Sequence, residues 1–211
     1  MRKTFPLLLL AGVLVANIVA QSGRKGMTPP PPPRPETLSE PPITVRTESA
    51  PATAAALGAL PKSLLTRQLK SVDKGSFSLS DFAGKVIVVN LWATWCGPCR
   101  MEVPEYEKVR KEYEGRAVEF IGLTTEDPLT SANKVRQFAR DFKFGFRLGW
   151  ADPDTARTIM NGRNSIPQTV VIAADGRIVS HWRGYSRGQG GDRLRQTIEG
   201  ALTDTSTPAV R

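Results

Sequence analysis

The chain has 211 residues, a formal net charge of +9 and two cysteines. This length allows one domain of ordinary size with a substantial core, together with flanking segments that need not fold. The Lys and Arg residues are scattered without a dense basic run, which argues against a nucleic-acid-binding protein and favours solubility and weak attraction to anionic membranes.

The N-terminal segment, residues 1–22, predicts export from the cytoplasm. Arg2 and Lys3 precede an apolar run over residues 5–20, the order found in signal peptides and in short membrane anchors. The run is short for a membrane span, whereas Ile18 is large for a cleavage motif of small residues. An uncleaved anchor and a cleaved signal therefore both remain open. Either one would place the rest of the chain in the periplasm or at the extracytoplasmic face of the membrane.

Residues 23–62 have the composition of a linker. They are rich in Pro, Ala, Ser and Thr, show no apolar periodicity and include five consecutive prolines at positions 29–33. Such a segment is expected to be a disordered spacer with a reach on the order of 35 Å. A proline-motif ligand for a partner is the alternative. The polar C-terminal residues 204–211 are expected to be a disordered tail.

The folded domain is predicted over residues 63–203 and begins with a β-hairpin. The segment from Ser63 alternates around Asp73, Lys74 and Gly75, and the glycine supplies the positive φ of a turn. Three short apolar runs then predict buried strands, because they are rich in β-branched residues and too short for helices. A turn at Asp175 and Gly176 returns the chain as one more antiparallel strand. The three buried strands are expected at residues 86–91, 118–124 and 169–173.

Helical patterns lie between these strands. Apolar residues at spacings of three and four predict a helix near residues 131–143, and a last helix carries Leu194, Ile198 and Leu202. Asp152 and Pro153 open a short helix that stops at Asn161 and Gly162. Strands that alternate with helices and close in a hairpin predict an α/β sandwich, with helices on both faces of a central sheet.

The two cysteines are placed for redox chemistry. Cys96 follows the strand at 86–91, and Cys99 leads into the helix-forming segment 100–113. A helix N-terminus stabilises a thiolate and lowers the pKa of the thiol, and only the thiolate attacks a disulfide. We expect Cys96, nearer the exposed end, to be the nucleophile and Cys99, one turn deeper, to resolve the mixed disulfide.

A structural disulfide and a metal site are the other roles that a cysteine pair can have. A structural disulfide that closes so small a loop would add little stability. A zinc site usually takes four ligands, and the only histidine, His181, lies in a predicted strand. We therefore expect no cofactor and no resident metal. Copper(I) accepts two thiolates and a third soft ligand, so a copper-delivery protein stays the alternative function.

The sequence WCGPC at residues 95–99 resembles the active-site motif of the thioredoxin superfamily. Over residues 63–202 the order of the elements is similar to that of the exported TlpA/ResA-like thiol–disulfide oxidoreductases. This resemblance implies a thioredoxin-like fold: a central mixed β-sheet flanked by helices, with an N-terminal β-hairpin extension.

The resemblance also implies roles for residues around the cysteines. Pro167 would follow a cis peptide bond, and Trp95, Ile166 and Pro167 would form the docking surface for substrate. Asn90 replaces the buried aspartate of cytosolic thioredoxins, so the proton acceptor must come from elsewhere. Glu102, one helical turn past Cys99, is the candidate, as in TlpA/ResA-like proteins. Pro104 should kink the helix.

Together these features predict an exported protein-disulfide reductase. By resemblance, its electrons would come from a membrane electron donor, and its partners would be disulfide-containing exported proteins such as apocytochrome c or copper-site proteins. The direction of the reaction depends on the redox potential, where about 30 mV shifts the equilibrium tenfold.

Overall fold

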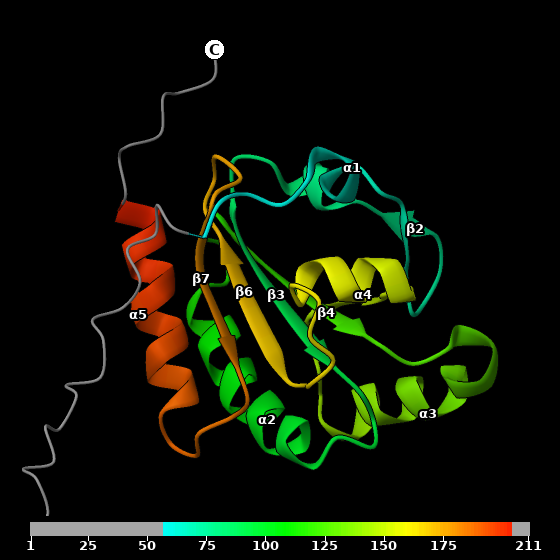
Figure 1. The fold of residues 1–211 in the computed structure, drawn as a ribbon. Helices are drawn as coiled ribbons and strands as arrows, with labels where there is room; N and C mark the ends of the chain where they lie inside the picture. The colour runs from blue at the N-terminus through cyan, green and yellow to red at the C-terminus, as the bar shows by residue number, and fades with distance from the viewer. Residues whose placement is uncertain (1–56, 204–211) are drawn as a thin grey trace, which may run out of the picture. The chain divides into compact units, whose positions relative to one another are not determined.

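The computed structural model describes residues 57–203 (Figure 1). The predicted export segment, residues 23–56 of the predicted linker and the predicted C-terminal tail lie outside these residues. Within the described range, no helix is long and apolar enough to cross a membrane.

A five-stranded mixed sheet forms the centre of this domain, in the order β5-β4-β3-β6-β7. The central strand β3 runs parallel to β4, which runs parallel to β5. On the other side of β3, strand β6 is antiparallel to β3, and β7 is antiparallel to β6. The strands are β3 (Val86–Trp92), β4 (Val118–Thr124), β5 (Arg147–Trp150), β6 (Gln168–Ile172) and β7 (Ile178–Arg183).

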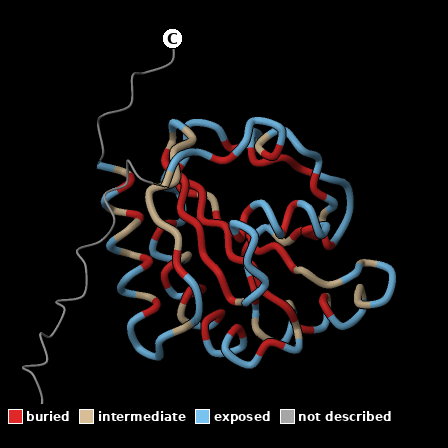
Figure 2. Tube along the Cα trace, in the orientation of Figure 1, coloured by how far each residue is buried: buried red, intermediate tan, exposed pale blue. Residues whose placement is uncertain are grey.

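Every residue of β3 is buried, because helices or loops cover both faces of the sheet (Figure 2). Successive side chains of a strand point to opposite faces, and β3 accordingly contributes to two separate cores. Val86, Val88 and Trp92 belong to one hydrophobic cluster. Ile87, Val89 and Leu91 belong to the other. The continuous apolar run predicted as a doubly buried strand is therefore confirmed.

Three helices pack in the first cluster: α2 (Gly97–Glu112), α3 (Pro128–Asp141) and α5 (Gly190–Thr203). The second cluster is covered by α4 (Pro153–Ile159) and by short N-terminal elements (Figure 1). These are α1 (Lys62–Leu65), β1 (Leu69–Lys70), β2 (Ser76–Phe77) and the 3-10 helix η2 (Leu79–Phe82). The thioredoxin-like fold expected from the sequence is confirmed.

The helix boundaries follow local capping chemistry. The Asp152 carboxylate accepts hydrogen bonds from the first backbone N–H groups of α4, and the helix stops before two residues with positive φ, Asn161 and Gly162. Helix α3 begins earlier than predicted from its apolar spacing. Its cap is Asp127, followed by Pro128 in the first turn.

Two details of the sequence prediction were wrong. Residues 62–65, in part assigned to the hairpin, form α1, and only Leu69–Lys70 pair with Ser76–Phe77 around Gly75. Strand β5 was missed because its four residues include an exposed arginine and a glycine, which hide any apolar alternation. Pairing with β4 makes this segment a strand.

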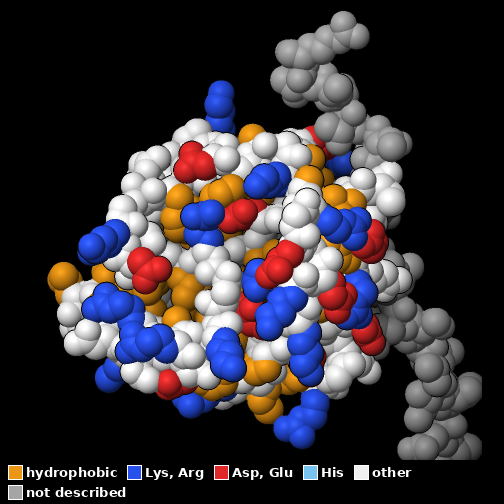
Figure 3. All heavy atoms as spheres, turned by 180° about the vertical axis from the view of Figure 1, so that it is seen from behind, with side chains coloured by type: hydrophobic (Ala, Val, Ile, Leu, Met, Phe, Trp, Pro, Cys, Tyr) orange, Lys and Arg blue, Asp and Glu red, His pale blue; other side chains and the backbone are white. Residues whose placement is uncertain are grey.

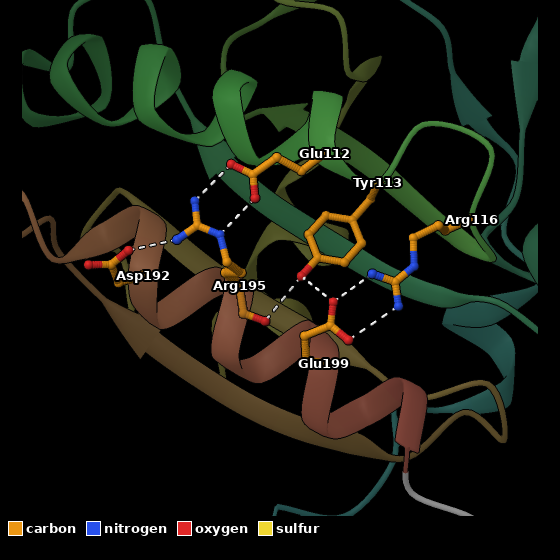
Figure 4. A network of polar contacts seen from close by, with 6 residues as sticks. All are labelled: Glu112, Tyr113, Arg116, Asp192, Arg195 and Glu199. Atoms are coloured by element: carbon orange, nitrogen blue, oxygen red, sulfur yellow. Dashed lines mark hydrogen bonds and ion pairs between the residues drawn. The ribbon is translucent and has the colours of Figure 1, made fainter.

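Polar contacts join the C-terminal end of helix α2, and the residues just after it, to α5 (Figure 4). Arg195 of α5 forms a two-point contact with Glu112 of α2, at 2.7 and 2.8 Å. The Tyr113 hydroxyl at the end of α2 donates to Glu199 of α5 at 2.9 Å. Exposed ion pairs contribute little to stability, so the buried side chains that α2 and α5 share in the first cluster account for most of the packing between the two helices.

Charged side chains are spread over the surface. On the side opposite to the view in Figure 1, Lys and Arg side chains lie among Asp and Glu side chains and do not gather in one patch (Figure 3).

The α5 packing can be tested by truncating one side chain. Leu194 is fully buried between α5 and the sheet, so Leu194→Ala should lower the free energy of unfolding by about 2–5 kcal/mol. Leu129 is 88% exposed, and Leu129→Ala should change the free energy of unfolding by less than about 0.5 kcal/mol. Urea unfolding measures both. Equal losses in the two variants would contradict this assignment of the core.

Candidate active site

The cysteines lie where the central strand leads into a helix. Cys96 is the N-cap of α2, and its Sγ accepts a hydrogen bond from the Cys99 N–H at 3.2 Å. The two sulfur atoms form a disulfide. Cys96 is 4% exposed and Cys99 is fully buried, so their order of exposure is the predicted one, although little of Cys96 reaches the surface.

The loop between β3 and α2 is held by side-chain contacts. Thr94 donates through its backbone N–H and its hydroxyl to the Glu126 carboxylate, at 2.6 and 2.9 Å. The Arg100 guanidinium of α2 donates to the Thr94 carbonyl at 3.2 Å. These contacts fix the backbone directly before Cys96.

Trp95 and Ile166 meet at the surface beside the cysteines. Trp95 is 72% exposed and lines two grooves, which we call the front grooves. One has a volume of about 340 Å³ and also includes Ile166. The other, of about 680 Å³, runs along Arg100 and α3. The Ile166–Pro167 peptide bond is cis, as the resemblance implied, but the Pro167 side chain is buried. The accessible part of the predicted docking residues is therefore Trp95 with the half-buried Ile166.

Beneath the cysteines, α2 places a carboxylate in the core. Glu102 is 1% exposed, and its Oε2 accepts a hydrogen bond from the Asn90 amide at 2.8 Å. Asn90 lies on the face of β3 that α2 covers, since it alternates in phase with Val88 and Trp92. Its amide also donates to the Thr169 hydroxyl at 3.2 Å. The sequence linked Asn90 and Glu102 only because Asn90 lacks a carboxylate and Glu102 offers one. The fold brings the two side chains into direct contact.

Asn90 is the first of three hydrogen-bonding side chains that lie side by side on neighbouring strands, which we call the polar row. Asn90 of β3 pairs with Thr169 of β6, and Thr169 pairs with Trp182 of β7. The Tyr106 hydroxyl of α2 connects the row, since it lies 3.3 Å from the Thr169 hydroxyl and accepts from Trp182 Nε1 at 3.1 Å. Glu102 is therefore part of a buried network drawn from three strands and one helix.

The environment of Glu102 suits proton exchange. Burial raises the pKa of Glu102 to about 7, while the Asn90 amide and the Tyr106 hydroxyl oppose this rise. Burial also raises the pKa of Tyr106 far above its usual value, so the hydroxyl stays protonated. A carboxyl group with a pKa near neutrality can both accept and release a proton under ordinary conditions.

The structure places His181 away from the cysteines. It lies on β7 with Nε2 at 2.8 Å from Gln168 Oε1, which matches its interpretation as a residue of the sheet. Among residues 57–203, no group of three or more metal-binding side chains lies close enough to hold a metal ion.

A family model for Redoxin matches residues 47–193. The chain belongs to the Redoxin family. With the WCGPC motif and the fold described above, it is a TlpA/ResA-like member of the thioredoxin superfamily.

Curated relatives of this Redoxin-family chain support the same assignment. It is 40% identical over 81 residues to the thioredoxin-like protein YneN of Bacillus subtilis, an alignment that covers 38% of this chain and 46% of that protein. It is 30% identical over 112 residues to the thiol-disulfide oxidoreductase ResA of Halalkalibacterium halodurans, covering 53% of this chain and 61% of the relative. The alignments thus span about half of each protein.

Solved structures support the fold. A thiol:disulfide interchange protein of the thioredoxin family from Chlorobium tepidum superposes with a TM-score of 0.59 at 24% identity, covering 74% of this chain and 99% of that one. StoA from Bacillus subtilis superposes with a TM-score of 0.50 at 17% identity, covering 62% of this chain and 94% of StoA. At these identities the likeness concerns the fold alone.

Sequence reasoning missed three members of the polar network: Tyr106, Thr169 and Trp182. One signal was present, because Thr169 is a polar residue at the start of an otherwise apolar strand. Tyr106 lies one turn beyond Glu102 on the same face of α2, a spacing that also marks neighbours on a helix. The pairing register that unites them could not be read from the chain.

The pKa of Glu102 predicts how stability depends on pH. The carboxyl group titrates near its ordinary pKa of 4.5 in the unfolded chain and near 7 in the folded chain. The unfolded state therefore loses the proton first as pH rises, and the free energy of unfolding falls between pH 4.5 and 7 by about 3 kcal/mol from this group.

Glu102→Gln keeps an acceptor for Asn90 and removes the titration. Urea unfolding of the two disulfide-bonded proteins should give similar stability at pH 4, and the variant should be more stable by about 3 kcal/mol at pH 8. A difference between the two proteins that does not change with pH would contradict the raised pKa.

Proposed function

We propose that this protein is a thiol–disulfide oxidoreductase that reduces disulfides in other exported proteins. The observation that carries the proposal is the Cys96–Cys99 pair at the start of α2, one helical turn from the buried carboxylate of Glu102. Two exchangeable sulfur atoms beside a group that accepts protons are what a dithiol reductant requires.

In the first step, Cys96 attacks a substrate disulfide. Its Sγ faces the free N–H groups of the first helical turn, and the Cys99 N–H already donates to it. These dipoles stabilise the thiolate relative to the thiol. The thiolate forms a bond to one substrate sulfur, and the other substrate sulfur leaves as a thiolate that takes a proton from solvent.

In the second step, Cys99 resolves the mixed disulfide. Its thiol transfers a proton to the Glu102 carboxylate, and the resulting thiolate attacks Cys96 Sγ. The second substrate sulfur leaves as a thiolate that takes a proton from solvent, the Cys96–Cys99 disulfide forms, and Glu102 then releases its proton to solvent. The substrate has gained two electrons, so a reductant must restore the dithiol. We assign this task to a membrane electron donor.

Trp95 and Ile166 serve as the docking surface, together with the backbone next to Pro167. An exposed tryptophan beside the nucleophile offers apolar contact area at low conformational cost, which is typical of binding hot spots. Pro167 cannot donate a ladder hydrogen bond, which leaves room for substrate backbone to pair at this edge.

The setting of the reaction follows from the export segment predicted at residues 1–22. We propose a periplasmic or extracytoplasmic location, with residues 5–20 as a possible anchor, and apocytochrome c or copper-site proteins as substrates, which would give the protein a role in cytochrome c biogenesis. The alternative function is Cu(I) delivery through the same two cysteines.

Trapping tests the redox proposal. In Cys99→Ser, Cys96 can form a mixed disulfide but cannot be released, so expression of the full chain in its native host should capture substrate proteins as adducts that dithiothreitol separates. The matched control is the double variant Cys96→Ser/Cys99→Ser, which should capture none. Well-expressed Cys99→Ser without adducts under oxidising conditions would refute the proposal.

The purified protein separates the two candidate functions. A reductase should accelerate the reduction of insulin by dithiothreitol and lose this activity in Cys96→Ser. A copper carrier would instead bind Cu(I) in a fixed ratio without turnover.

Trp95→Ala tests the docking surface. Loss of its contacts should raise KM for insulin about thirtyfold, the size expected for an interface hot spot, with little change in kcat. Leu129→Ala removes a similarly exposed side chain that lines neither front groove and should leave KM unchanged. An unchanged KM in Trp95→Ala would remove Trp95 from the docking surface.

A further inference from the structure

A second pocket reaches the site from another direction. It has a volume of about 110 Å³ and lies between α2, the end of β7 and the start of α5; we call it the rear pocket. Its inner wall consists of the buried residues Glu102, Tyr106 and Trp182, and its outer wall includes the exposed residues Ser186 and Arg193. It shares no residue with the two front grooves.

Half of the Glu102 carboxylate is left without a partner. Oε2 accepts from Asn90, whereas Oε1 is buried and has no hydrogen-bond partner among residues 57–203. The Tyr106 hydroxyl favours the charged form of Glu102, but its hydrogen-bond contacts are with Thr169 and Trp182. A buried polar oxygen without a partner is costly, and such atoms are usually satisfied by water. The rear pocket is well above the roughly 10–15 Å³ that one water needs, and its inner wall offers polar groups.

We propose that the rear pocket is a water-filled route through which Glu102 exchanges its proton with solvent while a protein substrate covers the cysteines. This inference rests on the proposed function and deepens it. In that function Glu102 takes a proton from Cys99 and must lose it before the next cycle. The carboxyl group loses its proton to a pocket water, and that water passes it to bulk solvent.

The need for such a route follows from the geometry of docking. Cys99 is fully buried and Cys96 nearly so. A protein bound on Trp95 and Ile166 therefore shields the cysteines from the solvent that could still reach them past these two residues. The rear pocket opens on a different set of residues and stays in contact with solvent. A small disulfide would leave the front open, so only protein substrates should depend on the rear route.

Charged and aromatic groups surround the mouth of the pocket. The Arg193 guanidinium lies over the Trp182 ring at 4.7 Å, and the Tyr185 hydroxyl donates to Glu105 at 2.5 Å. Glu105 raises the pKa of Glu102, although less than burial does. The charged and titratable groups that line the pocket or lie at its edge are Glu105 and Tyr106 from α2, Arg183 from β7, Tyr185 from the following loop and Arg193 from α5.

Two neighbouring glycines allow a matched test. A Cβ added at Gly190, which lines the pocket, would lie 3.4 Å from both Glu105 Oε2 and Tyr185 Cε2 and 3.5 Å from Tyr106 Cε1. A Cβ added at Gly191 would meet only Val109 Cγ2, at 3.6 Å, and Gly191 does not line the pocket. Gly190→Val should therefore narrow the route, and Gly191→Val is its control in the same helical turn.

The experiment compares two substrates of the full chain. Gly190→Val should slow turnover of insulin by about tenfold or more, the scale of lost acid–base catalysis, while turnover of a small aromatic disulfide stays within about twofold. Gly191→Val should leave both rates unchanged. Equal slowing of both substrates, or of neither, would overturn the proposal. If the wild-type protein reduces neither substrate, the proposed function itself fails.

A second measurement needs no turnover. At pH 5 the Glu102 carboxyl is protonated, and its infrared band can be assigned by its loss in Glu102→Gln. To cover the front, each glycine variant is combined with Cys99→Ser and trapped as a mixed disulfide between Cys96 and a protein substrate. After transfer of these adducts to D2O, hydrogen–deuterium exchange of this band should be slower in Gly190→Val than in Gly191→Val. Equal exchange rates would exclude the rear route even if the enzyme is active. Thermal unfolding checks that the variants fold. If Gly190→Val does not fold, Gly190→Ala replaces it and should slow exchange and turnover in the same direction by a smaller factor.

Discussion

The hydrogen bond between Asn90 and Glu102 is the contact on which the organisation of the site depends. It joins the central strand to the helix that carries both cysteines, and it holds a carboxyl group in a place where burial alone would strongly favour the neutral form. Because the amide favours the charged form, the two influences leave the pKa of Glu102 close to neutrality. The neutral side chain of Asn90 thus holds the Glu102 carboxyl group, one helical turn from Cys99, by donating a hydrogen bond to it.

The rest of the fold keeps this pair in place. Covering both faces of β3 removes water from Asn90, and the row through Thr169 and Trp182 uses the register of three strands to position polar atoms at one depth. The start of α5, which packs with α2 in the first hydrophobic cluster, forms one side of the rear pocket beside Glu102. Trp95, next to Cys96, lines the front grooves, whereas the rear pocket reaches Glu102 from a separate part of the surface.

Much of the fold was predictable because the signals were local. Val86–Leu91 is apolar and β-branched, and Asp152 with Pro153 carries its own cap, so strand β3 and helix α4 needed no tertiary information. Strand β5 and helix α1 were missed because each has four residues and takes its structure from neighbours. Among the candidate site residues, Cys96, Cys99 and Glu102 lie close together in the chain at the start of α2, so the WCGPC motif and the family resemblance pointed to them. Tyr106, Thr169 and Trp182 meet only through pairing across the sheet.

The sequence by itself determined the identity of the reactive pair, its position between a strand and a helix, and the family to which the chain belongs, because these depend on residues adjacent in the chain. Only the tertiary structure decided that Asn90 donates to Glu102, that Pro167 is buried while Trp95 is exposed, and that a second pocket reaches the carboxylate. The physical reason is that these hydrogen bonds, burial and cavities arise between segments separated by many residues. The pairing register that aligns the strands cannot be read from the sequence of any one segment.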